Sequence, residues 1–272
     1  MKNLDWSSAT TQFLPVDDVS IEMRAWGPLR SKTLPVVLLH EGLGSVAMWR
    51  DFPEKLATTI GTGVLAYSRQ GYGQSDPCTL PRPLDYMERE ATRVLPRILD
   101  AADIKQCILV GHSDGASIAA LHQMTGDDRV RGLVLMAPHF FVEDLSVESI
   151  GIVRTAWRET DLPRRLGKYH RDPENAFLGW NQAWLDPAFR DWNISHCIDR
   201  FRVPCLAIQG KLDGYGTKAQ VDIISARSPG PVETHMLDEC QHSPHKDQPA
   251  ETLALISDFV RRISATESAT AS

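Results

Sequence analysis

Short apolar runs recur along this chain, and polar or amphipathic stretches of helical length separate them. Runs of valine, leucine and isoleucine bounded by glycine, proline or charged residues are typical of strands buried on both faces. They lie at residues 34–39, 64–67, 108–110, 130–136, 203–209 and 232–237, and the alternating segment 19–26 is predicted as an edge strand. Because strand and helix patterns alternate, we predict an α/β fold with a mostly parallel central sheet and right-handed crossovers.

Helical periodicity fills most of the stretches between these strands. We predict helices near residues 49–60, 84–102, 116–124, 218–227 and 249–263, the second of them interrupted at Pro96. The chain ends in T-E-S-A-T-A-S, which is short of apolar residues, so we expect this tail to be disordered.

The alternation stops between residues 141 and 199, where no buried strand run occurs. This segment is rich in helix formers and carries the large aromatic residues Trp157, Tyr169, Phe177, Trp180, Trp184, Phe189 and Trp192. We predict a helical cap of residues 141–199, inserted into a core domain of residues 1–140 and 200–272. Open α/β sheets bind ligands at the carboxyl ends of their strands, so we expect the cap to cover that edge. Its tryptophans either pack between cap and core or line a cleft.

Composition narrows the classes of partner. At 272 residues and 42% hydrophobic content, the chain can bury a large core. Its net charge of −6, with no lysine or arginine run, argues against nucleic acid or an anionic membrane and favours a neutral or cationic small molecule. No apolar stretch approaches the roughly 18 residues of a membrane span, so we expect a cytoplasmic protein. The scattered cysteines form no C-x-x-C pair, and no metal or cofactor is expected.

The strongest chemical signal is the sequence G-H-S-D-G at residues 111–115. It follows a predicted strand and precedes a predicted helix, which is the context required of the nucleophile elbow G-x-S-x-G. The same short pattern also occurs in ordinary glycine-rich turns, and the flanking elements favour the functional interpretation. Such a turn lifts the hydroxyl of Ser113 above the sheet edge and places a helix N-terminus beneath it.

A serine hydroxyl is a poor nucleophile unless a base takes its proton, and that base needs a carboxylate to orient it. Asp213 follows the strand at 203–209, and His242 follows the strand at 232–237. The order Ser, Asp, His is that of an α/β-hydrolase triad. Asp238 and Glu239 are rival acids, but they follow the wrong strand for the acid position.

Four motifs give the chain a family resemblance over nearly its whole length: H-E-G-L-G-S followed by Trp49, S-R-Q-G-Y-G-Q-S-D, G-H-S-D-G, and Q-H-S-P-H-K-D-Q-P. Together they resemble those of α/β-hydrolase-fold enzymes. The resemblance implies an oxyanion hole made by the backbone N–H of Asp114 and that of Gly42 or Leu43, with His40 and Arg69 supporting these loops.

The same resemblance decides between two candidate bases. The family's catalytic histidine is the first one in H-x-P-x-x-x-x-P, which selects His242 over His245 and leaves His245 at the surface or behind the catalytic residues. A serine at the elbow excludes the epoxide-hydrolase and dehalogenase branches, which use aspartate there. We therefore expect a carboxylic ester hydrolase that acts on a small-molecule ester through an acyl-Ser113 intermediate.

Other activities on the same triad stay open at this point. They are hydrolysis of lactones or amides, cleavage of a C–C bond in a vinylogous diketone, and a receptor without catalytic activity. No sequence pattern sets the oligomeric state.

Two acids depart from the family's common pattern, Glu41 in the place of a glycine and Asp114 beside the nucleophile. An aspartate in the first turn of a helix is stabilised by the helix dipole, whereas Glu41 has no such local reason. Two acids at this place favour a substrate that carries a cation, and the chain is similar in this respect to tropine-ester hydrolases of the atropine acylhydrolase type. We expect the pocket to be lined by Glu41, Trp49, Phe140, Trp157, Trp180 and Trp184.

Overall fold

A single eight-stranded sheet forms the centre of the computed structural model, which describes residues 3–8, 10–30 and 33–270. The strand order is β1-β2-β4-β3-β5-β6-β7-β8. The first two pairings, β1 with β2 and β2 with β4, are antiparallel, and all the others are parallel. The strands are β1 (Gln12–Val16), β2 (Val19–Trp26), β3 (Val36–Leu39), β4 (Val64–Tyr67), β5 (Cys107–His112), β6 (Val130–Met136), β7 (Cys205–Gly210) and β8 (Val232–Leu237). The predicted α/β fold with a mostly parallel sheet is confirmed.

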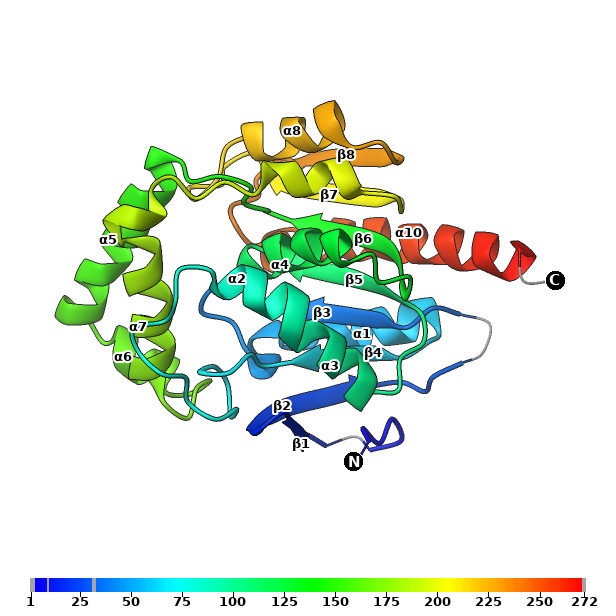
Figure 1. Cartoon of the computed structure of the whole chain (residues 1–272), viewed down its shortest axis with the longest axis horizontal. Helices are drawn as coiled ribbons and strands as arrows, with labels where there is room; N and C mark the ends of the chain where they lie inside the picture. Colours follow the sequence, from blue (N-terminus) through cyan, green and yellow to red (C-terminus); the bar gives the residue numbers. More distant parts are fainter. Residues whose placement is uncertain (1–2, 9, 31–32, 271–272) are drawn as a thin grey trace.

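Helices cover both faces of this sheet (Figure 1). One face packs against α1 (Phe52–Ile60) and α10 (Pro249–Thr270). The other packs against α2 (Tyr86–Arg89), α3 (Leu95–Ala101), α4 (Asp114–His122) and α8 (Ala219–Arg227). Along β3, Val36 and Leu38 belong to the first cluster while Val37 and Leu39 belong to the second, because successive side chains of a strand point to opposite faces. Strands buried on both faces explain why their sequences read as continuous apolar runs.

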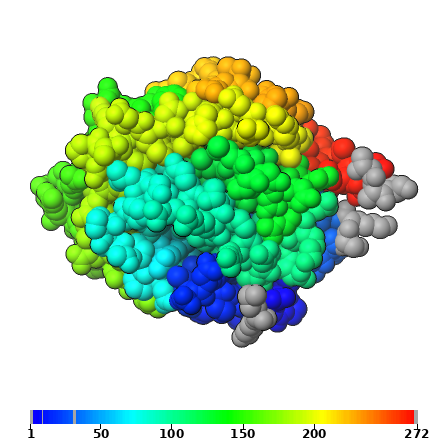
Figure 2. Space-filling model, viewed as in Figure 1, coloured from blue at the N-terminus to red at the C-terminus, as the bar shows by residue number. Residues whose placement is uncertain are grey.

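The helical segment 141–199 contains α5 (Asp144–Glu159), α6 (Leu162–Leu166) and α7 (Pro173–Trp184), followed by short 3₁₀ turns at Pro187–Phe189 and Ser195–Arg200. Figure 1 shows these three helices grouped at one end of the sheet, beyond the strands. In the view of Figure 2 the atoms of this segment lie directly against those of the loop after β4. There Asn175 of α7 accepts a hydrogen bond from the backbone N–H of Cys78 at 3.0 Å and donates one to its carbonyl at 2.8 Å.

The structure corrects two predictions about the strands and helices of the core. The segment 19–26 is not an edge strand, because β1 pairs outside it; β1 was missed since it is short and contains Pro15. The helical stretch from Tyr86 to Ala101 is not interrupted at Pro96. A π-helical turn at Glu90–Val94 precedes the proline, which then occupies the first turn of α3, where its missing N–H costs little.

A third correction concerns the tail, which was expected to be disordered. Its residues up to Thr270 continue α10 instead. The guanidinium of Arg131 on β6 donates from Nε to Glu267 at 2.7 Å and so fixes this last part of the helix to the sheet. Among the described residues, no helix combines the length and the apolar character needed to cross a bilayer.

The buried histidines predict how stability depends on pH. Burial lowers the pKa of His40, His122, His139, His170 and His245 relative to the unfolded chain. Below a pH of about 6.5 the unfolded state therefore binds more protons, and the free energy of unfolding falls as the pH drops. We expect urea unfolding to show a loss on the order of several kcal/mol between about pH 7.5 and about pH 5.5.

A matched pair of variants tests this explanation away from the candidate site. His122 is fully buried and its Nδ1 donates to the carbonyl of Ala91 at 2.7 Å, whereas His196 is exposed. His122→Gln should reduce the dependence of stability on pH, and His196→Gln should leave it unchanged. Equal stability of the unmodified protein at the two pH values would contradict the prediction.

Candidate active site

Ser113 lies in a sharp turn between β5 and α4. Its backbone has φ 54° and ψ −120°, and its N–H donates to the carbonyl of Met136 at 2.9 Å. A Cβ added at Gly111 would lie 2.3 Å from the carbonyl oxygen of Gly115, and one added at Gly115 would lie 2.1 Å from that of Leu39. Only glycine fits at these two positions, so the motif G-H-S-D-G reflects close backbone packing around the serine.

The three residues predicted as a triad lie within hydrogen-bonding distance of one another. Nε2 of His242 lies 2.9 Å from the hydroxyl oxygen of Ser113, and Nδ1 lies 2.9 and 2.8 Å from the two carboxylate oxygens of Asp213. With its proton on Nδ1, the imidazole donates to the carboxylate and presents a lone pair to the serine. His242 is partly exposed, whereas the carboxylate of Asp213 is buried.

Two further donors, one from a side chain and one from the backbone, orient Asp213. Gln209 at the end of β7 donates to one carboxylate oxygen at 2.8 Å, and the N–H of Tyr215 donates to the other at 2.8 Å. Burial raises the pKa of Asp213, but the hydrogen bonds from His242 and Tyr215 outweigh it and leave the pKa lowered. Gln209 was not among the predicted site residues, although a glutamine at the end of an apolar strand run is a signal that the sequence contains.

Residues 41–44, which we call the 41–44 turn, lie just beyond the carboxyl end of β3. The N–H of Gly44 donates to the carbonyl of Glu41 at 3.0 Å, which closes a β-turn. That bond does not use the N–H groups of the two central residues, Gly42 and Leu43. Asp114 is the first residue of α4, so its N–H has no acceptor within the helix.

His40 and Arg69 hold this turn from the core side, as the sequence suggested. Nδ1 of His40 donates to the carbonyl of Glu41 at 2.7 Å, and Nη2 of Arg69 donates to the same carbonyl at 3.0 Å. The N–H of Arg69 in turn donates to Nε2 of His40 at 3.0 Å. Burial and the charge of Arg69 hold the pKa of His40 well below its usual range, so its ring stays neutral and can accept that bond.

A pocket of about 310 Å³ opens above Ser113. Its lining comprises Glu41, Gly42, Leu43, Ser113, Asp114, His139, Ile150, Val153, Trp180, Trp184, Tyr215, Gln241, His242, Ser243 and Asp247. Of the six residues expected to line it, Glu41, Trp180 and Trp184 do so.

The other three expected lining residues lie elsewhere, each because it packs in a core. Trp49 is 2% exposed and stacks on Phe52 on the far face of the sheet. Phe140 is fully buried, and its N–H donates to the side chain of Gln220. Trp157 does not line the pocket; it is partly buried and stacks on Phe177, with ring centroids 4.1 Å apart.

The carboxylate of Glu41 already has a cationic partner. Lys246 of the short helix α9 (Pro244–Asp247) places its ammonium nitrogen 3.2 Å from it, and Nδ1 of His112 lies at 3.5 Å. Burial raises the pKa of Glu41, but Lys246 and His112 outweigh it and hold that pKa well below its usual range. Glu41 is therefore an ionised carboxylate whose charge is balanced within the protein.

Asp114 is likewise engaged by protein groups. It is 1% exposed, and its carboxylate accepts hydrogen bonds from the hydroxyl of Tyr86 at 2.5 Å and from Nε1 of Trp184 at 3.2 Å. Trp184 belongs to α7, so this carboxylate connects the helical segment to the helix that follows Ser113.

Two histidines that the sequence analysis set aside lie beside the site. His139 lines the pocket, and burial lowers its pKa to about 3, so its ring is neutral. His245 was expected at the surface or behind the catalytic residues, and it is 5% exposed with its ring 4.8 Å from that of Trp49. The surface alternative was therefore wrong, because the apolar contacts of α9 with the core bury His245.

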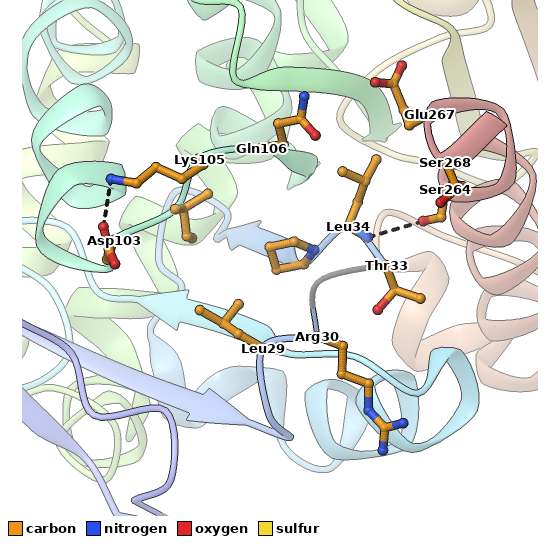
Figure 3. A pocket seen from close by; sticks show the side chains of 12 residues that line it. Leu29, Arg30, Thr33, Leu34, Asp103, Lys105, Gln106, Ser264, Glu267 and Ser268 are labelled. Atoms are coloured by element: carbon orange, nitrogen blue, oxygen red, sulfur yellow. Dashed lines mark hydrogen bonds and ion pairs between the residues drawn. The ribbon is translucent and has the colours of Figure 1, made fainter. Parts of the chain in front are cut away.

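A second cleft lies at the opposite end of the sheet (Figure 3). Two hydrogen-bonded pairs lie around it: Lys105 pairs with Asp103 at 2.7 Å, and the N–H of Leu34 donates to the hydroxyl of Ser264 at 3.2 Å, and no triad of nucleophile, base and acid is among the described residues that line it. Within the described ranges, no cluster of three histidine, cysteine or acidic side chains could hold a metal ion. The pocket above Ser113 is therefore the candidate active site.

The fold and the linked serine, histidine and aspartate are those of the α/β class of hydrolases. A model of the alpha/beta hydrolase family matches residues 36–255. The chain belongs to this family.

Curated relatives carry several hydrolase activities. The chain is 25% identical over 213 residues to the human serine hydrolase BPHL, covering 73% of this chain and 69% of that protein. It is 26% identical over 205 residues to epoxide hydrolase B of Mycobacterium tuberculosis, covering 73% of this chain and 53% of that protein. The crystal structure of a proline iminopeptidase from Mycobacterium smegmatis superposes with a TM-score of 0.75 at 16% identity, covering 95% of this chain and all of that one. These relatives support a hydrolase, and the structural likeness shows the fold alone.

Close packing over the 41–44 turn predicts an effect of mutation at Gly42. A Cβ there would lie 2.2 Å from Nε1 of Trp180, so Gly42→Ala must displace the indole. We expect the free energy of unfolding to fall by about 1–3 kcal/mol in urea titrations. Gly151→Ala in α5 is the control, because its Cβ would meet nothing within 4 Å and should raise stability by about 0.5–1 kcal/mol. Equal effects of the two substitutions would show that Trp180 does not constrain the turn.

Proposed function

We propose that this protein hydrolyses a small carboxylic ester through an acyl-Ser113 intermediate. The observation that carries the proposal is the continuous hydrogen-bonded arrangement of Ser113, His242 and Asp213 at the floor of a pocket. The nucleophile and the base open into the pocket, and the carboxylate orients the base from behind it.

The proposed reaction begins with attack of the Ser113 oxygen on the ester carbonyl, while Nε2 of His242 takes the serine proton. Asp213 stabilises the resulting imidazolium. The negative oxygen of the tetrahedral intermediate accepts from the N–H of Asp114 and from that of Gly42 or Leu43. His242 then gives its proton to the leaving alcohol as the ester C–O bond breaks. Water next attacks the acyl-enzyme with His242 as base, and the second tetrahedral intermediate collapses by breaking its bond to the Ser113 oxygen, which takes the proton back from His242 as the carboxylic acid leaves.

The helical segment 141–199 acts in this proposal as a cap that supplies the apolar walls. Ile150 and Val153 of α5 and Trp180 and Trp184 of α7 line the pocket. Apolar walls favour burial of an apolar acyl or alkoxy group and exclude water from the reacting carbonyl. A pocket of about 310 Å³ suits a small ester.

The proposed substrate is an uncharged ester. The sequence favoured an amino-alcohol ester of the tropane type, because Glu41 and Asp114 lie beside the proposed oxyanion hole. Contacts of these side chains support an uncharged ester instead: Glu41 pairs with Lys246, and Asp114 accepts bonds from Tyr86 and Trp184. Lys246 offsets the charge of Glu41, and the guanidinium of Arg69, 3.9 Å from the carboxylate of Asp114, offsets the charge of Asp114, so neither charge is available for an ammonium group.

Substitution of the triad tests the reaction itself. Ser113→Ala should abolish labelling by a fluorophosphonate probe and hydrolysis of p-nitrophenyl butyrate. Asp213→Asn and His242→Ala should each lower kcat by about 10⁴. Asp238→Asn is the control for the acid, because Asp238 is exposed and pairs with Lys211 at the surface. Labelling that persists in Ser113→Ala, or an equal loss in Asp238→Asn, would overturn the assignment.

Removal of both charges of the Glu41–Lys246 pair tests the charge of the substrate. A single Glu41→Gln change would leave Lys246 uncompensated and would itself repel a cation, so the double variant Glu41→Gln with Lys246→Met is used. We expect the ratio of kcat/KM for a choline ester to that for the isosteric 3,3-dimethylbutyl ester to stay within about threefold of wild type. A carboxylate that binds the ammonium group would contribute about 1–3 kcal/mol, so its removal would lower the ratio roughly 5- to 150-fold.

Other carbonyl compounds reach the same nucleophile, and a panel separates them. The purified protein is offered an activated ester, a lactone, an anilide and a vinylogous diketone at equal concentration. We expect the highest kcat/KM for the ester. A higher value for the diketone would instead identify a C–C bond hydrolase, and failure of every substrate to give a burst of acyl-enzyme would favour a receptor.

A further inference from the structure

The helical segment contacts the 41–44 turn at two points. Trp180 of α7 lies over Gly42, as the packing above showed. His170, in the connection between α6 and α7, donates from Nε2 to the carbonyl of Leu43 at 3.0 Å. His170 is 2% exposed and lies outside the pocket, so it meets the turn from behind.

The other nitrogen of the same ring is also bound, and this fixes its tautomer. The N–H of Gly73 donates to Nδ1 of His170 at 2.9 Å, so the ring proton lies on Nε2, where it serves the carbonyl of Leu43. The next residue strengthens the link, because the N–H of Arg171 donates to the carbonyl of Gly73 at 2.7 Å. Burial lowers the pKa of His170, which favours the neutral form that both bonds require.

The bond to Leu43 acts on the geometry of the turn. The carbonyl of Leu43 and the N–H of Gly44 belong to one peptide plane, and that N–H closes the turn on the carbonyl of Glu41 at 3.0 Å. Once this plane is fixed at both edges, the dihedral angles of the two central residues are restricted. The directions of the N–H groups of Gly42 and Leu43 follow from those angles.

We propose that His170 is a positioning residue that holds the 41–44 turn in the orientation needed to bind an oxyanion. The proposal rests on the proposed esterase function of the same site. His170 belongs to the helical segment, whereas the turn belongs to the core. The proposal therefore implies that the oxyanion hole forms only when the helical segment is packed against the core.

Three variants test the proposal. His170→Leu removes both hydrogen bonds, whereas His170→Gln keeps an acceptor and a donor on one side chain. We expect kcat for p-nitrophenyl butyrate to fall about 10- to 100-fold in the leucine variant with KM within about threefold, since deletion of an oxyanion donor costs about 10²–10³. The glutamine variant should recover most of this loss. Arg171→Ala is the control, because it breaks only the exposed ion pair with Asp76, and it should match wild type.

Amide hydrogen exchange of the peptide spanning residues 41–46 supplies a readout that does not depend on activity. Exchange there should become faster in His170→Leu and should stay near wild type in His170→Gln and Arg171→Ala. If the leucine variant does not fold, His170→Asn replaces it, because that side chain is too short to reach both partners.

Unchanged exchange in the variant that lacks both bonds, or a loss of kcat that glutamine fails to restore, would overturn the role of His170. If the wild-type protein hydrolyses no ester, the esterase proposal is overturned. The amide hydrogen exchange of residues 41–46 would still show whether His170 holds the turn.

Discussion

The positive φ of Ser113 is the constraint on which the rest of the site depends. A residue with a Cβ adopts this conformation at a cost of about 1–3 kcal/mol, and only where its surroundings enforce it. Here the enforcing contacts are the bond from its N–H to Met136 and the close approach of Gly115 to the carbonyl of Leu39. These contacts join the turn after β5 to the ends of the two strands that flank β5, which are β3 and β6. The strain is therefore offset by the most buried part of the sheet, and the serine hydroxyl is directed toward His242.

The carboxylates around the pocket all have partners within the protein. Four carboxylates line or adjoin it, and each is bound by protein groups: Asp213 by His242, Glu41 by Lys246, Asp114 by Tyr86 and Trp184, and the exposed Asp247 by the N–H groups of Gln241 and Ser243. A buried carboxylate without partners would lose its hydration without compensation. Through these contacts the acids hold the loops and helices around the proposed oxyanion hole in position.

The 41–44 turn is held from both sides, by His40 and Arg69 from the core and by His170 from the helical segment. A turn that carries unused N–H groups has little internal bonding to define it, so outside contacts must do so. This arrangement gives the helical segment two roles in the proposed function. It supplies the apolar wall, and it fixes the donors.

Features that depend on local backbone chemistry could be predicted from the amino-acid sequence. Glycines at 111 and 115 marked the elbow, because no other residue fits so near a neighbouring backbone, and the strands at Val64–Tyr67, Val130–Met136 and Val232–Leu237 have the predicted bounds. The order of strands along the chain then placed Ser113, Asp213 and His242 at one edge. A short strand with a proline, β1, gave too weak a local pattern to be found.

Contacts between side chains of distant segments could not be predicted in this way. Trp180 and Trp157 are equally plausible in sequence, and packing of the helical segment turned one into the pocket and stacked the other on Phe177. Lys246 lies 205 positions from Glu41, and no pattern in either segment foretold their ion pair. Local sequence sets backbone conformation because its causes act within a few residues. The charge and shape of the pocket arise from contacts between distant segments, which exist only once the sheet and its helices have packed.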